Sequence, residues 1–224
     1  MLHLVLKPKR NVKVLVWKIT EKLSTLERIY LTDNSKKRVD GMKSEIHKKG
    51  FLSVRHLLAN LDYTDDDLFY TNDGKPHLKD GRRISITHSF NFSAIIISDN
   101  SVGIDIEKNR DKIMRIAHKF IGKEKNFTEP EMLVYKNEDA PGFIDKDLLK
   151  KEIIERLTKI WGAKESLYKI HPADGLSFKK HLIIEQFKIN GVNTKGWIIK
   201  DNHYKVFKIR FKQIENFTLA FAYN

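Results

Sequence analysis

Short apolar runs recur along the first half of the chain at the lengths that are typical of strands. Residues 83–89 alternate between apolar and polar positions, and residues 12–19 and 94–98 are largely apolar. Alternation puts every second side chain on one face, so it predicts a strand with a buried face. We predict a fourth strand over 101–107 and expect the last three of these strands to pair consecutively in an antiparallel sheet.

Longer segments have apolar residues three and four positions apart, which is the period of a helix with one buried face. This pattern covers residues 110–121 and 146–169. It also covers 34–61, where Asn34 or Ser35 can cap the helix and Gly50 is expected to end or kink it. The other predicted elements are a short helix from Thr20 to about Arg28, a short helix or turn at 65–67, a turn at 72–76, a loop over 123–145 with a short helix at 128–136, and strands over 181–188, 195–200, 204–211 and 216–222.

Each half of the chain therefore combines a long helix with several strands. This combination predicts an α+β fold in which each helix packs on a mainly antiparallel sheet. The shared arrangement of the halves indicates an internal repeat, although the two halves are not visibly alike in sequence. We place the N-terminal half at 1–100 and the C-terminal half at 101–224.

The composition excludes several classes of protein and favours an anionic partner. The 224 residues include no cysteine, which excludes disulfides and thiolate chemistry, and no H-E-x-x-H spacing for zinc is present. No apolar run approaches a membrane span and the start lacks the order of a signal peptide, so we expect a cytoplasmic protein. The net charge of +13 favours nucleic acid, a phosphorylated small molecule or an acidic protein as partner.

Two carboxylates interrupt the predicted strand over 101–107. Asp105 and Glu107 are two residues apart, so in a strand both point to one face while Ile104 and Ile106 face a core. Neighbouring carboxylates repel each other, and Mg²⁺, which prefers oxygen ligands and binds substrate phosphates, relieves that repulsion. The alternative is an edge strand with a solvated acidic end, and the pair alone favours this alternative.

A second charged pair lies near the end of the predicted helix over 146–169. Glu165 and Lys169 are four residues apart, so they share one helix face, as an ordinary surface ion pair also would. The combination of G-I-D-x-E with W-x-x-K-E-S-x-x-K is much more specific than either stretch alone. With these two stretches the chain resembles the 4'-phosphopantetheinyl transferases, of the single-chain, surfactin-synthetase-activating type that serves peptide and polyketide synthases.

Two further motifs lie earlier in the chain: Gly74-Lys75-Pro76 and Ile86-Thr87-His88-Ser89. All four motifs occur in the order that the family has. The resemblance extends from about residue 34 to residue 169. It implies a pseudo-dimer of two similar α/β halves with the active site in the cleft between them. The 55 residues between Asp105 and Trp161 exceed the family's usual spacing, and we assign the extra length to the 123–145 loop.

The resemblance also implies a reaction and roles for individual residues. The family transfers the 4'-phosphopantetheine arm of its substrate coenzyme A to a serine of an apo carrier protein and releases 3',5'-ADP. Asp105, Glu107 and Glu165 would hold Mg²⁺, which offsets charge on the phosphate under attack. Glu165 would also be the base for the serine, directly or through water, and Lys169 would stabilise charge on the pyrophosphate.

Four more residues are assigned to coenzyme A by the same resemblance: Lys75, Thr87, His88 and Arg55. Thr87 stands where the family more often has serine, and it keeps the hydroxyl group. Each of the others has an alternative explanation. Lys75 is equally a solvated turn lysine, His88 a strand histidine bonded to the backbone, and Arg55 a helix arginine paired with a nearby aspartate.

The partner implied by the resemblance is an acidic acyl or peptidyl carrier protein, which the basic surface would attract. A monomer is expected because the pseudo-dimer is internal to the chain. Two other functions stay open: a basic nucleic-acid-binding module, and an inactive relative that binds coenzyme A or carrier protein. No helix-turn-helix, zinc or aromatic RNA-binding signature supports the first, and the presence of all the carboxylates argues against the second.

Overall fold

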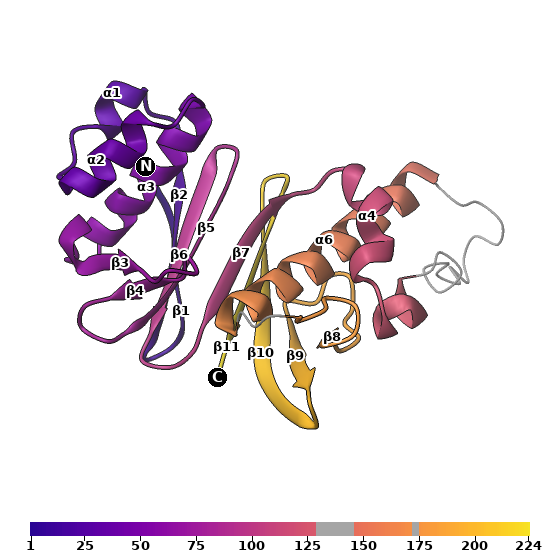
Figure 1. Cartoon of the computed structure of the whole chain (residues 1–224). Helices are drawn as coiled ribbons and strands as arrows, with labels where there is room; N and C mark the ends of the chain where they lie inside the picture. Colours follow the sequence, from indigo (N-terminus) through magenta and orange to yellow (C-terminus); the bar gives the residue numbers. More distant parts are fainter. Residues whose placement is uncertain (129–145, 172–174) are drawn as a thin grey trace. The chain divides into compact units, whose positions relative to one another are not determined.

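The computed structural model describes residues 1–128, 146–171 and 175–224, and its helices and strands are drawn in Figure 1. Helices and strands are both abundant, which confirms the predicted α+β class. Over the described part of the chain, every helix is too short or too polar to cross a membrane. The predicted short helix at 128–136 lies, apart from Thr128, outside the described residues.

The chain forms two compact units. The first contains residues 1–106 together with 223–224, and the second contains residues 107–222. The boundary falls within β7 (Gly103–Lys108), a few residues beyond the position at residue 100 that the sequence predicts. The two predicted carboxylates of this strand are thus divided, with Asp105 in the first unit and Glu107 in the second.

The first unit is built on a four-stranded antiparallel sheet in the order β1-β2-β6-β5. The central strand β6 is buried along its whole length because it pairs on both sides and supplies Ile95, Ile96 and Ile97 to the core. The sequence pattern does not predict β1, since this edge strand has no buried residue. The strands are β1 (Leu2–Lys9), β2 (Val12–Lys18), β5 (Arg83–Ser89) and β6 (Phe92–Ser98).

Helix α3 (Glu45–Ala59) packs on β2, β5 and β6 of this sheet. Two predicted helix starts are wrong by a few residues. Helix α1 (Leu23–Leu26) begins after Lys22 rather than at Thr20, and α2 (Asp33–Asp40) is capped by Thr32, whose hydroxyl accepts a hydrogen bond from the Ser35 N–H, rather than by Asn34 or Ser35. The expected short helix and turn are present as η1 (Asp65–Asp67) and the hairpin of β3 (Leu68–Tyr70) with β4 (Pro76–Leu78).

Gly50 does not end a helix, so this part of the prediction is wrong. It lies inside α3, which is continuous from Glu45 to Ala59. A Cβ added at Gly50 would lie 3.2 Å from Cγ of His88, so the glycine lets the imidazole lie against the helix backbone. The residue that looked like a local helix breaker therefore serves a contact with a strand far away in the sequence.

Strands β8 to β11 and β7, of which Glu107 and Lys108 belong to the second unit, form a five-stranded sheet in the order β7-β11-β10-β9-β8. Here the expectation that β5, β6 and β7 pair consecutively is wrong for β7. Strand β2 occupies the free edge of β6, and β7 pairs with the last strand of the chain instead. The other strands are β8 (Leu182–Ile184), which is shorter than predicted, β9 (Asn193–Lys200), β10 (His203–Ile214) and β11 (Phe217–Tyr223).

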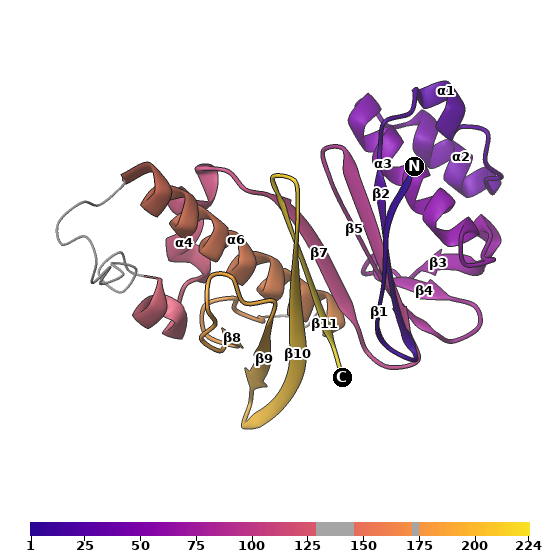
Figure 2. The same cartoon turned by 180° about the vertical axis from the view of Figure 1, so that it is seen from behind.

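Helix α6 (Lys146–Ile170) is the long helix of the second unit and packs on β8, β9 and β10, as Figures 1 and 2 show from opposite sides. Its core contacts include Leu157, Ile160 and Leu167. Helix α4 (Lys112–Phe120) packs on α6 and leads into η2 (Lys123–Phe127). The predicted helix over 146–169 is thus confirmed to within one residue, and the helix predicted over 110–121 is confirmed in position but is three residues shorter.

Candidate active site

Asp105 is buried in β7, with 5% of its surface exposed, and is held by a hydroxyl group of β5. The Oγ1 of Thr87 donates a hydrogen bond to Oδ1 of Asp105 over 3.2 Å and accepts one from the backbone N–H of Ile106 over 3.3 Å. Two residues earlier, Oγ of Ser85 accepts a hydrogen bond from the N–H of Ile104 over 3.2 Å. The alternation of β5 therefore presents two hydroxyls to one edge of β7.

The coenzyme A contact of Thr87 that the family resemblance implies stays a prediction. The contact seen for its buried hydroxyl is with the carboxylate that is expected to bind metal. A hydroxyl that donates to one carboxylate oxygen fixes the orientation of the other. We therefore regard Thr87 as an orienting residue for Asp105.

Glu107 belongs to the second unit and lies against α6. The indole Nε1–H of Trp161 donates a hydrogen bond to Oε1 of Glu107 over 3.3 Å. Beside them is a cavity of about 150 Å³ whose lining combines apolar side chains with three cationic ones. Its lining residues are Glu107, Lys108, Arg110, Lys112, Ile113, Ile116, Thr158 and Trp161.

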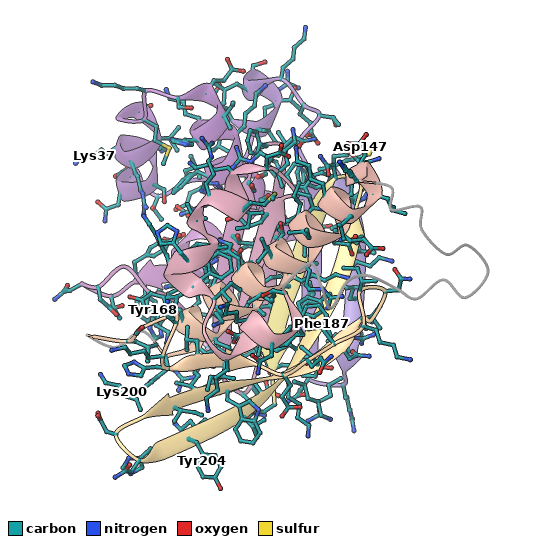
Figure 3. All side chains as sticks on the ribbon, turned by 90° about the vertical axis from the view of Figure 1, so that its right-hand side faces the viewer. Lys37, Asp147, Tyr168, Phe187, Lys200 and Tyr204 are labelled. Carbon is teal, nitrogen blue, oxygen red and sulfur yellow. The ribbon has the colours of Figure 1, made fainter. Side chains whose placement is uncertain are left out.

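The second half of α6 is buried except for one narrow strip. Between positions 160 and 170, only Trp161, Glu165, Tyr168 and Lys169 are half-buried, and every other residue is buried. At 100° per residue these four positions fall within about one quadrant of the helix surface. The sequence motif thus places Glu165 and Lys169 on the accessible strip of the second half of α6. Figure 3 labels Asp147 and Tyr168 near the two ends of this helix.

Trp161 is held between two aromatic rings. Phe178 stacks on the indole with ring centroids 5.3 Å apart and an interplanar angle of 29°, and Phe120 meets it edge-on at 5.1 Å. Tyr168 also contacts Phe178, with centroids 5.3 Å apart. The aromatic packing orients the indole N–H that binds Glu107.

Lys164 is a residue of the motif to which the sequence analysis assigns no role. It is fully buried and forms an ion pair of 2.9 Å with Glu124, which is also fully buried. Burial lowers the pKa of Lys164, and the charge and hydrogen bond of Glu124 oppose that shift. Lys164 lies among the small residues Gly162, Ala163 and Ser166, and this local pattern was the available signal that its side chain is buried and has a specific partner.

Arg55 forms an ion pair with an aspartate, which is the alternative to a coenzyme A contact that the sequence left open. Its guanidinium is 4% exposed and pairs with Oδ1 of Asp65 over 2.8 Å, and it lies 3.5 Å from the ring centroid of Phe51. Burial raises the pKa of Asp65, but hydrogen bonds from Ser35, Thr32 and Arg55 outweigh this, so the pKa lies below its ordinary value. Arg55 thus stabilises the first unit, and we leave it out of the proposed coenzyme A contacts.

Lys75 and His88 both belong to the first unit and retain accessible surface. His88 is exposed near the end of β5, lies against Gly50 of α3 and has its ring centroid 6.3 Å from that of His47. Lys75 is half-buried, and burial followed by the nearby charge of Arg83 lowers its pKa. Both side chains remain candidates for contacts with an anion.

The carboxylate donors suit Mg²⁺ chemically, since they offer hard oxygen ligands and Thr87 orients one of them. Across residues 1–128, 146–171 and 175–224, no three His, Asp or Glu side chains stand together as a ready metal-binding cluster. The structure brings Glu107 to Trp161 and Asp105 to Thr87. The convergence of Asp105, Glu107 and Glu165 on one ion stays a prediction.

The C-terminal part of the chain matches a known protein family. Residues 101–222 match the family described as ACPS: 4'-phosphopantetheinyl transferase superfamily. The match covers more than half of the chain and includes both β7 and α6. A search of curated proteins gave no match. The chain, with its G-I-D-x-E strand and W-x-x-K-E helix, belongs to the 4'-phosphopantetheinyl transferase superfamily.

Proposed function

We propose that this chain, acting as a single-chain monomer, transfers 4'-phosphopantetheine from coenzyme A to a serine of an apo acyl or peptidyl carrier protein with Mg²⁺. Membership of the superfamily implies phosphopantetheinyl transfer in general. The observation that carries the more specific proposal is the accessible strip of α6, where Glu165 and Lys169 share a face with Trp161, the hydrogen-bond donor to Glu107. Acid and base groups on one face suit phosphoryl transfer, which depends on positioning and charge stabilisation.

The proposed step is a displacement at the phosphorus that carries the pantetheine arm. The serine Oγ forms a bond to this phosphorus while the bond from phosphorus to the bridging oxygen breaks, and 3',5'-ADP leaves with that oxygen. Glu165 accepts the serine proton, directly or through a water molecule. Lys169 offsets the negative charge that grows on the departing phosphate.

The metal ligands proposed are Asp105, Glu107 and Glu165. When bound there, Mg²⁺ neutralises part of the charge of the diphosphate. Thr87 orients Asp105 through its hydroxyl, and Trp161 orients Glu107 through its indole N–H. Each of the two strand carboxylates therefore has its own positioning group.

The proposed contacts with the phosphates of coenzyme A come from Lys75 and His88, which both keep accessible surface. The three cationic residues that line the cavity next to Glu107 offer further positive charge within the second unit. A site that combines carboxylates with several cations suits an anionic substrate that arrives with a divalent metal.

The experiment that tests the proposal measures the intact mass of apo carrier proteins after incubation with this protein, coenzyme A and Mg²⁺. A panel of acyl and peptidyl carrier proteins is used, and each is compared with a reaction that contains EDTA from the start. The expected result is the mass increase of one phosphopantetheine on at least one carrier protein, which EDTA prevents.

No mass increase on any carrier protein, together with coenzyme A binding in calorimetry, would favour the inactive relative over the transferase. No binding of coenzyme A, together with retention on single-stranded nucleic acid at physiological salt, would instead favour the nucleic-acid-binding module. A mass increase that is insensitive to EDTA would remove the metal from the proposal.

A further inference from the structure

The buried Lys164 joins three segments of the second unit. Its Nζ donates hydrogen bonds to the carbonyl oxygens of Phe120 and Phe178 over 2.7 and 2.9 Å, and to Oε1 of Glu124 over 2.9 Å. An ammonium group has three N–H donors, so these three acceptors account for all of them.

Glu124 continues this network on its other side. Its Oε1 accepts a hydrogen bond from the N–H of Ile184 over 2.9 Å, and its Oε2 accepts one from the N–H of Gly122 over 3.0 Å. The pair therefore ties α6 to the end of α4, to η2, to the segment before β8 and to β8 itself. Because both side chains are fully buried, water does not compete for these bonds.

The two carbonyls bound by Lys164 belong to the residues whose rings enclose Trp161. Phe120 and Phe178 pack on the indole from two directions, and the indole N–H in turn binds Glu107. A continuous series of contacts thus leads from the buried ion pair, through two backbone carbonyls and their own side chains, to a carboxylate at the edge of the basic cavity.

We propose that Lys164 is a positioning residue that holds Trp161, and through it the carboxylate of Glu107, in a fixed orientation. Only the metal-binding role of Glu107 rests on the proposed function. The positioning itself concerns contacts within the second unit.

The presence of a buried ion pair at this place supports a role in positioning Trp161 rather than a role in packing alone. An apolar side chain of similar length would fill the same space, and replacing a buried ion pair by apolar groups is often neutral for stability. An apolar group has no directional contact with a carbonyl oxygen, so Phe120 and Phe178 would lose their common anchor. The charged pair therefore adds a single fixed orientation of the Trp161 indole.

The test uses a variant in which both charges are removed together, K164M/E124Q. Removing Lys164 alone would leave a buried carboxylate without a counter-charge and could unfold the unit. Glutamine at 124 keeps an acceptor oxygen for one of the two backbone N–H groups, while methionine at 164 keeps the length of the side chain. The two phenylalanine carbonyls then lack the ammonium group.

The chain offers a matched control on the same helix. Lys159 is also buried, pairs with Glu155 over 2.8 Å and donates to the carbonyl of Ile189. The variant K159M/E155Q therefore removes a second lysine and glutamate pair from α6 without touching Phe120, Phe178 or Trp161.

The first readout is the indole N–H signal in a proton–nitrogen correlation spectrum of protein without substrate. The chain has three tryptophans, Trp17, Trp161 and Trp197, and W161F identifies the signal of Trp161. In K164M/E124Q we expect this signal alone to shift and its exchange with solvent to accelerate at least about 10-fold, while K159M/E155Q leaves it in place. An unchanged Trp161 signal in K164M/E124Q, or the same change in K159M/E155Q, would overturn the inference.

The second readout is the Mg²⁺ concentration that gives half-maximal transfer. Groups that orient a metal ligand typically change metal affinity by 10- to 100-fold, so we expect an increase of about that size in K164M/E124Q and in W161F, with a smaller change at saturating Mg²⁺. A shifted indole signal with an unchanged Mg²⁺ requirement would keep the positioning role and remove Glu107 from the metal site. If the unmodified protein shows no transfer, the proposed function fails while the spectrum still decides the positioning.

Discussion

The hydroxyl of Thr87 donates a hydrogen bond to the buried carboxylate of Asp105 and accepts one from the next N–H in the same strand. One side chain thus fixes both a carboxylate oxygen and the backbone of β7 in this part of the first unit. Asp105 would be costly to bury without such a partner, because an ionised carboxylate loses its hydration there.

Replacement of Thr87 by valine tests this relationship. T87V keeps the shape but leaves the N–H of Ile106 and Oδ1 of Asp105 without this partner, so we expect a loss of about 1–3 kcal/mol in the free energy of unfolding. T87S keeps the hydroxyl and is expected to lose much less. Urea unfolding of both variants measures the difference, and equal stability of T87V and T87S would show that the hydroxyl is unimportant.

Replacement of Glu165 by glutamine should abolish most of the transfer activity and leave the fold intact. Glutamine accepts no proton at neutral pH, and loss of a positioned base typically costs about 10²- to 10⁴-fold in rate. Glu152 lies on the same helix, outside the accessible strip, so E152Q serves as the matched control. The rate of phosphopantetheine transfer is measured for both, and comparable rates would remove Glu165 from the mechanism.

The buried pair of Arg55 and Asp65 predicts an acid-sensitive first unit. The pKa of Asp65 is lower in the folded protein than its ordinary value, so its contribution to stability is complete above the unfolded pKa of about 4. This contribution is lost as the pH falls through the lower folded value. We expect D65N to be less stable than the unmodified protein at pH 7, by about 3–5 kcal/mol, because Arg55 then stays buried without its counter-charge.

Thermal unfolding followed from pH 7 to pH 3 measures this effect. The difference between D65N and the unmodified protein should shrink below the unfolded pKa of about 4, where the unfolded chain begins to bind a proton at Asp65. A constant difference across the whole range would assign the acid sensitivity to other groups. R55M/D65L, which removes both charges, is expected to recover much of the stability at pH 7.

Substitution of Gly50 by alanine tests the stability of α3 and the orientation of His88 separately. Alanine is favoured over glycine inside a helix by about 1 kcal/mol, and the atoms nearest to the added methyl group all belong to the exposed side chain of His88. We therefore expect G50A to unfold at a slightly higher urea concentration. If His88 contacts coenzyme A in the orientation seen here, calorimetry should show weaker coenzyme A binding in both G50A and H88A. Unchanged binding in both variants would show that His88 does not contact coenzyme A.

Local patterns in the sequence determined most of the elements. The strands β5 and β6 and the helices α4 and α6 lie where the apolar periodicity predicts them, because this periodicity reports which side of an element faces a core. The same argument places Glu165 and Lys169 on one face of α6. Motif spacing also indicated the family, and the match over residues 101–222 confirms the superfamily, while the single-chain, surfactin-synthetase-activating type stays a prediction.

The tertiary structure decided which elements meet. Strand β7 joins β11 rather than β6 because the free edge of β6 is taken by β2, a strand about 80 residues earlier in the chain. Gly50 lies inside α3 where His88 approaches the helix backbone, and the charge of Arg55 is satisfied by Asp65. Lys164 turns to buried carbonyls while its neighbour Glu165 stays accessible. Each outcome depends on a partner distant in sequence, and periodicity along the chain contains no information about such partners.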